Sequence, residues 1–120
     1  MKTILLIDDD SLVLRSLTKL LEKERFEVIP CTSYEEALKA FQGKNFDLIV
    51  SDIRMPGKNG VETVNDIQTN LTHSGKKDLP IIFITGYAEM SSELKAQFMG
   101  EILMKPVDSS DLIKTIRDYL

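Results

Sequence analysis

The sequence predicts a doubly wound α/β domain in which five parallel strands alternate with five helices. Short apolar runs of strand length recur along the chain, and apolar residues between them recur at steps of three and four, as on the buried face of a helix. Acids, hydroxyl residues, glycine or proline follow these runs. Because parallel strands need helical, right-handed crossovers, the alternation favours a parallel sheet between two layers of helices.

The first strand and the first helix come at the start of the chain. Thr3–Ile7 is an apolar run of strand length. Residues 11–25 then carry apolar side chains at helical spacing, and Asp10 or Ser11 would cap this helix. The change of period marks the boundary between the two elements.

Pro30 helps to place the second strand, which is expected over residues 26–32. Proline has no N–H to donate to a neighbouring strand, so this strand is expected at an edge of the sheet. Ser33 and Glu36 then have the spacing of a capping box, which predicts a short helix ending near Gly43.

The rest of the chain repeats the alternation of strands and helices. The expected elements are a strand over 48–51, a helix over 61–71, a polar loop over 72–78, a strand over 81–84, a helix from 91 or 92 to 99, a strand over 102–104 and a helix over 112–119. Met90, Met99 and Met104 are expected to fill the core. The strand order 2-1-3-4-5 puts the strand of Pro30 at an edge and leaves a switch point between the first and third strands.

The size and composition of the chain limit its architecture and its partners. With 120 residues, we expect one domain over 1–120. The 19 acids and 15 bases give a net charge of −4 without a basic block longer than Lys76-Lys77, which argues against nucleic-acid binding. The sequence has no apolar run of about 20 residues and no signal-peptide pattern, so a cytoplasmic protein without a membrane partner is expected. Its single cysteine, Cys31, excludes an intramolecular disulfide and is expected to serve in packing.

Acidic residues follow two of the expected strands. Asp8 and Asp9 follow the first strand, and Asp52 follows the third. In the order 2-1-3-4-5 these strands are neighbours about 4.8 Å apart, and their carboxyl ends open on one crevice. Two like charges about 4 Å apart repel by roughly 4 kcal/mol at an effective dielectric constant near 20. The three carboxylates are therefore expected to attract a cation or a proton.

The chemistry of this crevice favours phosphoryl transfer. Ligands that are all oxygen suit Mg²⁺ or Mn²⁺ better than zinc. Thr85 and Lys105, at the ends of the fourth and fifth strands, add a hydroxyl and an ammonium, which complement an anion. A metal ion and an ammonium can neutralise a phosphoryl group while a carboxylate attacks it. Pro106 suggests a cis peptide bond that directs Lys105 inward.

Four motifs carry a family resemblance. In this order, "ILLIDDD", "LIVSDIRMPGKNG", "IIFITG" and "ILMKP" resemble the CheY-like receiver domain of two-component response regulators, with its three-layer flavodoxin-like (βα)5 fold, and the likeness covers essentially all 120 residues. The resemblance implies that Asp52 accepts a phosphoryl group from a sensor histidine kinase or a phosphotransfer protein. It also implies catalysis only of the chain's own phosphorylation and dephosphorylation, so no enzyme acting on a separate substrate is expected.

The resemblance assigns roles to the other residues of the crevice. Asp8 and Asp9 are the acidic pair that holds Mg²⁺ with Asp52, and the backbone carbonyl of Arg54 completes the protein ligands. The remaining two roles are contacts to the phosphoryl group, by Thr85 and Lys105. The fourth helix, fifth strand and fifth helix form the face through which a homodimer would be expected.

The chain departs from the family pattern on that face. Three residues before Lys105, where the family usually has Tyr or Phe as a rotameric switch, this chain has Ile102. The segment between Gly86 and Lys105 is also a little short. Phosphorylation chemistry is therefore better supported than the usual coupling to output, and Tyr87 is a hypothetical replacement for the moving aromatic.

Two other functions remain as alternatives. The opening "ILLIDDDS" also resembles a haloacid-dehalogenase-like phosphatase, with Asp8 as nucleophile and Asp10 as acid/base, but that interpretation leaves Asp52 and the turn after it unexplained. The other alternative is an interaction module that no longer signals by phosphate, which Ile102 favours and the intact acidic set disfavours. The residue that takes up a phosphoryl label distinguishes a receiver domain from the phosphatase. A response to beryllofluoride distinguishes a receiver domain from the interaction module.

Overall fold

The computed structural model describes residues 1–43, 45–53, 62, 65–69, 79–85 and 100–120. Several expectations lie outside these residues: the loop over 72–78, the helix from 91 or 92 to 99, the Arg54 carbonyl, and the side chains of Tyr87, Met90 and Met99. Of the helix expected over 61–71, residues 62 and 65–69 are described, and they are helical. In the described part of the chain, no helix combines the length and the apolar character needed to cross a membrane.

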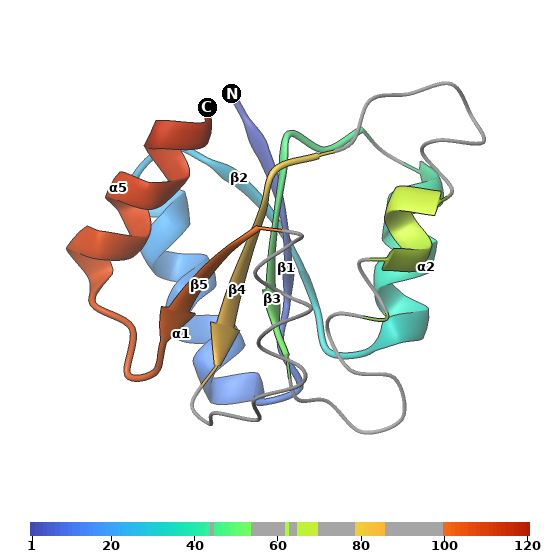
Figure 1. Ribbon diagram of the computed structural model, residues 1–120, viewed down its shortest axis with the longest axis horizontal. Coiled ribbons are helices and arrows are strands. Elements are labelled where there is room, and N and C mark those ends of the chain that lie inside the picture. Colours follow the sequence, from blue (N-terminus) through green and yellow to red (C-terminus); the bar gives the residue numbers. More distant parts are fainter. Residues whose placement is uncertain (44, 54–61, 63–64, 70–78, 86–99) are drawn as a thin grey trace.

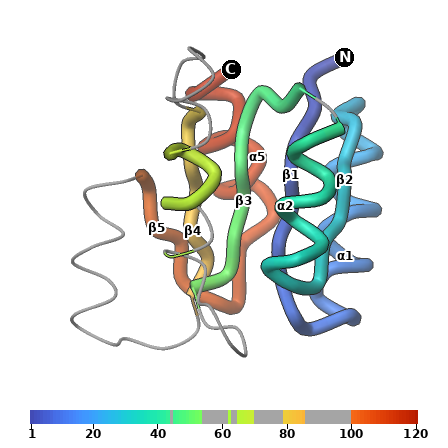
Figure 2. The backbone as a smooth tube through the Cα atoms, turned by 90° about the vertical axis from the view of Figure 1, so that its right-hand side faces the viewer, coloured from blue at the N-terminus to red at the C-terminus, as the bar shows by residue number. Residues whose placement is uncertain are grey.

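A five-stranded parallel sheet forms the centre of the fold (Figure 2), and its strand order β2-β1-β3-β4-β5 confirms the predicted order 2-1-3-4-5. The strands are β1 Thr3–Ile7, β2 Glu27–Cys31, β3 Leu48–Asp52, β4 Ile81–Thr85 and β5 Glu101–Met104. Each expected strand is present, and its ends differ from the prediction by at most one residue. Pro30 lies on the edge strand β2, as expected for a residue without a backbone donor.

Helices cover both faces of the sheet (Figure 1). α1 (Ser11–Lys23) and α5 (Ser109–Tyr119) lie on one face, while α2 (Tyr34–Gly43) and the helical residues 65–69 lie on the other. The predicted doubly wound architecture is therefore confirmed for the described elements.

Alternate residues of each strand contribute to two separate cores. Leu5 and Ile7 of β1 pack with Ala37 of α2 and with Ile67. Their neighbours on the strand, Ile4 and Leu6, pack instead in the cluster that contains residues of α1 and α5. Strands that are apolar on both faces are typical of buried parallel sheets, which explains the continuous apolar runs in the sequence.

The helix α1 ends earlier than the residue spacing predicts. The N–H of Arg25 donates to the Glu22 carbonyl at 3.0 Å, and the N–H of Phe26 donates to the Leu21 carbonyl at 3.2 Å. This is the hydrogen-bond pattern of a Schellman motif, and it requires a left-handed residue after the cap. Arg25 takes that conformation with a φ of 68°. The helix therefore ends at Lys23, and the prediction that it continues to residue 25 is wrong.

At the start of α2, one of the two hydrogen bonds of the predicted capping box is present. The N–H of Glu36 donates to Ser33 Oγ at 3.2 Å, as the motif requires. The Glu36 carboxylate does not return to the N–H of Ser33. It accepts instead from the N–H of Thr32 at 2.7 Å and from the Thr32 hydroxyl, and these bonds lower the pKa of Glu36.

The edge strand β5 places one methionine on the surface. Met104 is 53% exposed, so the expectation that it fills the core is wrong. Ile102 and Leu103 are the partly buried residues of this strand, and they pack on opposite faces of the sheet. Gly100, which precedes the strand, lies so close to the Ile81 carbonyl that a Cβ atom would overlap with it.

Arg25→Gly is expected to stabilise the protein by about 0.5–1 kcal/mol, because glycine adopts the left-handed conformation without a steric penalty. Urea denaturation measures the free energy of unfolding. Arg25→Ala is the matched control, since alanine removes the same side chain but keeps the strain. An equal gain in both variants would contradict this explanation of the helix end.

Gly100→Ala is expected to lower the free energy of unfolding by about 1–3 kcal/mol, because the new methyl group meets the backbone carbonyl of Ile81. Gly43→Ala is the control, since a Cβ at Gly43 would have no heavy atom within 4 Å. The control should be as stable as the original chain or slightly more so. If the two variants unfold at the same urea concentration, the close approach of Gly100 to β4 does not make a side chain at position 100 destabilising.

Candidate functional site

The predicted site residues that the structure describes all lie at one edge of the sheet. Asp8 directly follows β1, and Asp52 ends β3 in a register that pairs Ile7 with Ser51. Thr85 ends β4, and the backbone N–H of Lys105, just after β5, donates to its carbonyl at 2.8 Å. The carboxyl ends of adjacent parallel strands bring these four site residues, together with Asp9, into one crevice.

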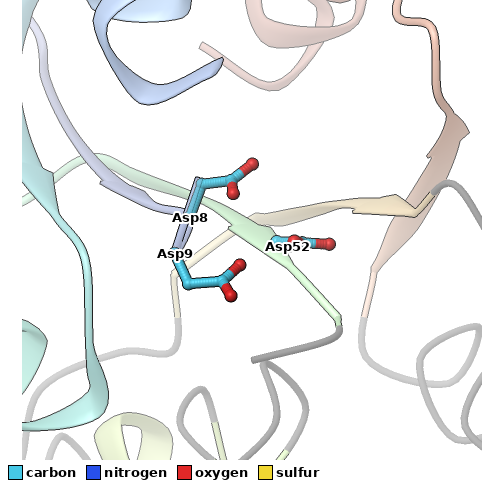
Figure 3. A group of neighbouring side chains, drawn as sticks. All are labelled: Asp8, Asp9 and Asp52. Atoms are coloured by element: carbon cyan, nitrogen blue, oxygen red, sulfur yellow. The ribbon is translucent and has the colours of Figure 1, made fainter. Parts of the chain in front are cut away.

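Three carboxylates come together in this crevice (Figure 3). Oxygen atoms of Asp8, Asp9 and Asp52 lie within 4.8 Å of one another. Asp8 and Asp52 are buried, with exposed fractions of 2% and 7%, whereas Asp9 is exposed. The predicted crowding of acids at the ends of the first and third strands is therefore confirmed.

Lys105 bridges the two buried acids. Its Nζ lies 3.2 Å from Asp8 Oδ2 and 3.3 Å from Asp52 Oδ2. Burial disfavours the ammonium, but the negative charges of Asp52 and Asp8 outweigh that effect and raise the pKa of Lys105 above its ordinary value. The peptide bond between Lys105 and Pro106 is cis, as the sequence suggested.

The second oxygen of Asp8 is held by the backbone. The N–H of Asp10 donates to Asp8 Oδ1 at 2.9 Å. The side chain of Asp10 has a different task, because its Oδ1 accepts from the N–H groups of Leu12 and Val13 and so caps α1. The backbone of Asp10 is a site contact that sequence analysis missed, since a main-chain donor leaves no signal in residue type.

The donor set fits a hard divalent cation. Three carboxylates offer only oxygen, which is the ligand type that Mg²⁺ and Mn²⁺ prefer. Thr85 is 1% exposed at the neighbouring strand end. The arrangement therefore combines a carboxylate that can act as a nucleophile, an acidic group that could hold a metal ion, a hydroxyl and an ammonium.

A groove lies beside the crevice, between α1 and the segment over 105–107. It has a volume of about 560 Å³, and apolar residues such as Val13, Leu17 and Val107 line most of it. Leu12 on its rim is 72% exposed. Lys105 forms part of the wall, so the groove and the acidic crevice share a residue.

Known proteins resemble this chain over nearly its whole length. The family model for the response regulator receiver domain matches residues 4–117. The phosphoglycerate transport system transcriptional regulatory protein PgtA of Salmonella typhimurium is 36% identical over 98% of this chain and 28% of its own length. The transcriptional regulatory protein CpxR of Klebsiella pneumoniae is 32% identical over 100% of this chain and 50% of its own length. The chain thus spans half or less of these relatives.

Solved structures agree with the sequence comparisons. The response regulator protein TrrA of Thermotoga maritima, in complex with Mg(2+)-BeF, is 33% identical, with a TM-score of 0.86 and 100% of both chains covered. A CheY-like receiver domain protein of Methanospirillum hungatei is 29% identical, with a TM-score of 0.87 over 98% of this chain and 92% of its own. The sequence match, the fold and the acidic cluster lead to the same family. The chain belongs to the receiver domains of two-component response regulators.

Proposed function

We propose that Asp52 accepts a phosphoryl group from a sensor histidine kinase or a phosphotransfer protein. One observation carries the proposal: Asp52 lies within 4.8 Å of two further carboxylates and 3.3 Å from the ammonium of Lys105. A buried carboxylate beside an ammonium and an acidic group that could hold a divalent cation is suited to attack an anionic phosphorus centre. Residues 1–120 would form one such domain, and it would act in the cytoplasm.

The proposed transfer forms one bond and breaks one. A carboxylate oxygen of Asp52 attacks phosphorus, and the bond between phosphorus and the donor's imidazole nitrogen breaks. The electron pair of that bond leaves with the imidazole. The Lys105 ammonium would balance the negative charge of the phosphoryl oxygens, and the Thr85 hydroxyl would donate a hydrogen bond to them. Hydrolysis of the aspartyl phosphate would return the site to its starting state, so the chain would act only on itself.

Mg²⁺ is the metal that we propose for the acidic group, with Mn²⁺ as a substitute. The carboxylates of Asp8, Asp9 and Asp52 would hold it together with the backbone carbonyl of Arg54, which lies outside the described residues. The complex of the relative TrrA with Mg(2+)-BeF supports this assignment. A bound Mg²⁺ supplies positive charge to the phosphoryl group.

The groove beside the crevice supports a protein as the phosphoryl donor. Its apolar lining and the exposed Leu12 offer surface that a partner can cover while its phosphohistidine reaches Asp52. A homodimer through the face that contains β5 and α5 remains a proposal from the family resemblance.

The structure disfavours the phosphatase alternative. That interpretation needs Asp8 as nucleophile and Asp10 as acid/base. Asp8 is 2% exposed with both oxygens engaged, and the Asp10 side chain caps α1. The interaction module is a matter for experiment, because Ile102 takes the place of the usual aromatic residue.

Asp52→Asn is expected to reduce labelling by radioactive acetyl phosphate and Mg²⁺ to background, because the variant lacks the attacking oxygen. Asp118→Asn on α5 is the matched control, and it should be labelled as fully as the original chain. Peptide mapping locates the label. Label on Asp8 would favour the phosphatase. The interaction module would be favoured if the original chain takes up no label and its oligomer size is the same with and without beryllofluoride.

Asp9→Asn is expected to weaken Mg²⁺ binding roughly tenfold, because it removes one negative ligand from the acidic group. Isothermal titration calorimetry of the metal with each protein measures the dissociation constant. Asp10→Asn is the adjacent control: it removes the same charge, keeps the cap of α1, and should change the constant only slightly. Equal affinity in the Asp9 variant and the original chain would remove Asp9 from the metal site.

A further inference from the structure

Asp10 connects the first turn of α1 with the acidic group. Its backbone N–H donates to Asp8 Oδ1 at 2.9 Å. Its side-chain Oδ1 accepts from the N–H of Leu12 at 3.0 Å and from the N–H of Val13 at 3.3 Å. Its carbonyl accepts from the N–H of Leu14 at 2.9 Å, which is the first hydrogen bond of the helix. Three groups of one residue therefore join α1 to the carboxylate of Asp8.

The helix α1 provides a firmly packed support for this contact. Leu14 and Leu21 on its inner face are buried in the core that also contains Leu6 of β1. The bonds to the first turn hold Asp10 in an extended backbone conformation, with a φ of −84° and a ψ of 108°, as expected for an N-cap residue. The direction of the Asp10 N–H toward Asp8 is therefore set by the position of the helix.

The carboxylate of Asp8 depends on such a support because it must keep one orientation. Its backbone is already fixed, since the N–H of Asp8 donates to the Cys31 carbonyl of β2 at 3.0 Å. Its side chain is 2% exposed, and the hydrogen bond from Asp10 holds one of its two oxygens. Hydrogen bonds that orient a ligand from outside raise metal affinity, because the ligand then has less freedom to lose when the metal binds.

We propose that Asp10 is a positioning residue of the metal site. Its side chain fixes the start of α1, and its N–H thereby keeps the Asp8 carboxylate oriented for a divalent cation. This inference rests on the proposed function, since it uses the same acidic group of Asp8, Asp9 and Asp52. Asp10 contributes as a hydrogen-bond acceptor for the helix, and its charge is not required. Asparagine and serine, which cap helices as well as aspartate does, should replace it.

Isothermal titration calorimetry of the full chain with MgCl₂ tests which property of Asp10 matters. Asp10→Ala removes the acceptor and should weaken Mg²⁺ binding roughly tenfold, because the Asp8 carboxylate loses its fixed orientation. Asp10→Asn removes the same charge but keeps the acceptor, so its dissociation constant should stay within about twofold of the original value. Equal weakening in the two variants would show an effect of charge alone and would overturn the inference. Unchanged affinity in Asp10→Ala would overturn it as well.

Two further variants separate positioning from a general loss of helix stability. Asp108 caps α5 by accepting from the N–H of Asp111 at 3.0 Å. Asp108→Ala should lower the unfolding temperature about as much as Asp10→Ala does, but it should leave Mg²⁺ binding unchanged. Asp10→Gly should keep most of the stability, because glycine is also favourable at an N-cap.

The glycine variant keeps the test decisive even where Asp10→Ala fails to fold. Glycine cannot accept the bonds from α1, and it leaves the backbone of residue 10 free to rotate. Asp10→Gly should therefore bind Mg²⁺ roughly tenfold more weakly than the original chain. The inference is wrong if Asp10→Gly binds Mg²⁺ as tightly as the original chain, or if Asp108→Ala loses as much affinity as the variants at position 10.

Amide hydrogen exchange in EDTA tests the contact to Asp8 without a metal. After correction for the intrinsic rate of each sequence, the N–H of residue 10 should exchange several-fold faster in Asp10→Ala than in Asp10→Asn, because its bond to Asp8 opens more often. Equal protection in the two variants would contradict the proposed role of the side chain. Failure of the metal site itself differs, because the original chain would then bind no Mg²⁺ while the difference in exchange remained.

Discussion

The parallel pairing of β1 with β3 is the constraint on which the site depends. The register sets Ile7 beside Ser51, so the next residue of each strand, Asp8 and Asp52, must end at the same edge of the sheet. The backbone at neither acid can shift far without disturbing a strand whose every residue is buried. The sheet thus holds two like charges together at a place where burial makes their repulsion costly. Lys105, which directly follows the edge strand β5, offsets this repulsion. Because β5 is joined to β3 through β4, the site forms only when four strands are in place.

Burial of apolar side chains on both faces of the sheet offsets the repulsion between the acids at the strand ends. Leu5 and Ile49 on one face, and Leu6 and Val50 on the other, are almost fully buried in the strands that carry the acids. Burial of each such side chain contributes about 1.5–3 kcal/mol, so the strands can hold a polar edge that is unfavourable by itself. The acidic edge is also where helix α1 begins, since Asp10 caps it and donates its N–H to Asp8. Asp10 therefore contributes both to the cap of α1 and to the position of the Asp8 carboxylate.

Features that depend on side-chain period were predictable from the sequence, and features that depend on one backbone conformation or one contact were not. The apolar run Thr3–Ile7 predicted β1 with the correct ends, because burial on both faces sets its composition. Pro30 predicted the edge strand, because proline has no N–H to donate. The end of α1 was mispredicted because the left-handed residue is Arg25, where glycine or asparagine would have been the signal. The convergence of Asp8, Asp52 and Lys105 was predicted from strand order, but the bridging position of the ammonium was not, since it depends on distances that spacing along the chain does not encode. The role of the Arg54 carbonyl stays a prediction.

The surroundings of Ile102 limit how a change at the site can reach the rest of the molecule. Ile102 is partly buried against the core that includes Phe83 and Ile81, so it packs as an aliphatic core residue of an edge strand. It has neither an aromatic ring nor a polar group that could exchange between a buried and an exposed position. Lys105 carries two contacts between the crevice and the end of β5: its ammonium contacts Asp8 and Asp52, and its N–H donates to the Thr85 carbonyl. Thr85 is also paired with Met104 of β5. Because the Lys105 ammonium contacts both buried acids, a change in the charge of the crevice acts directly on the residue that follows β5, independently of Ile102.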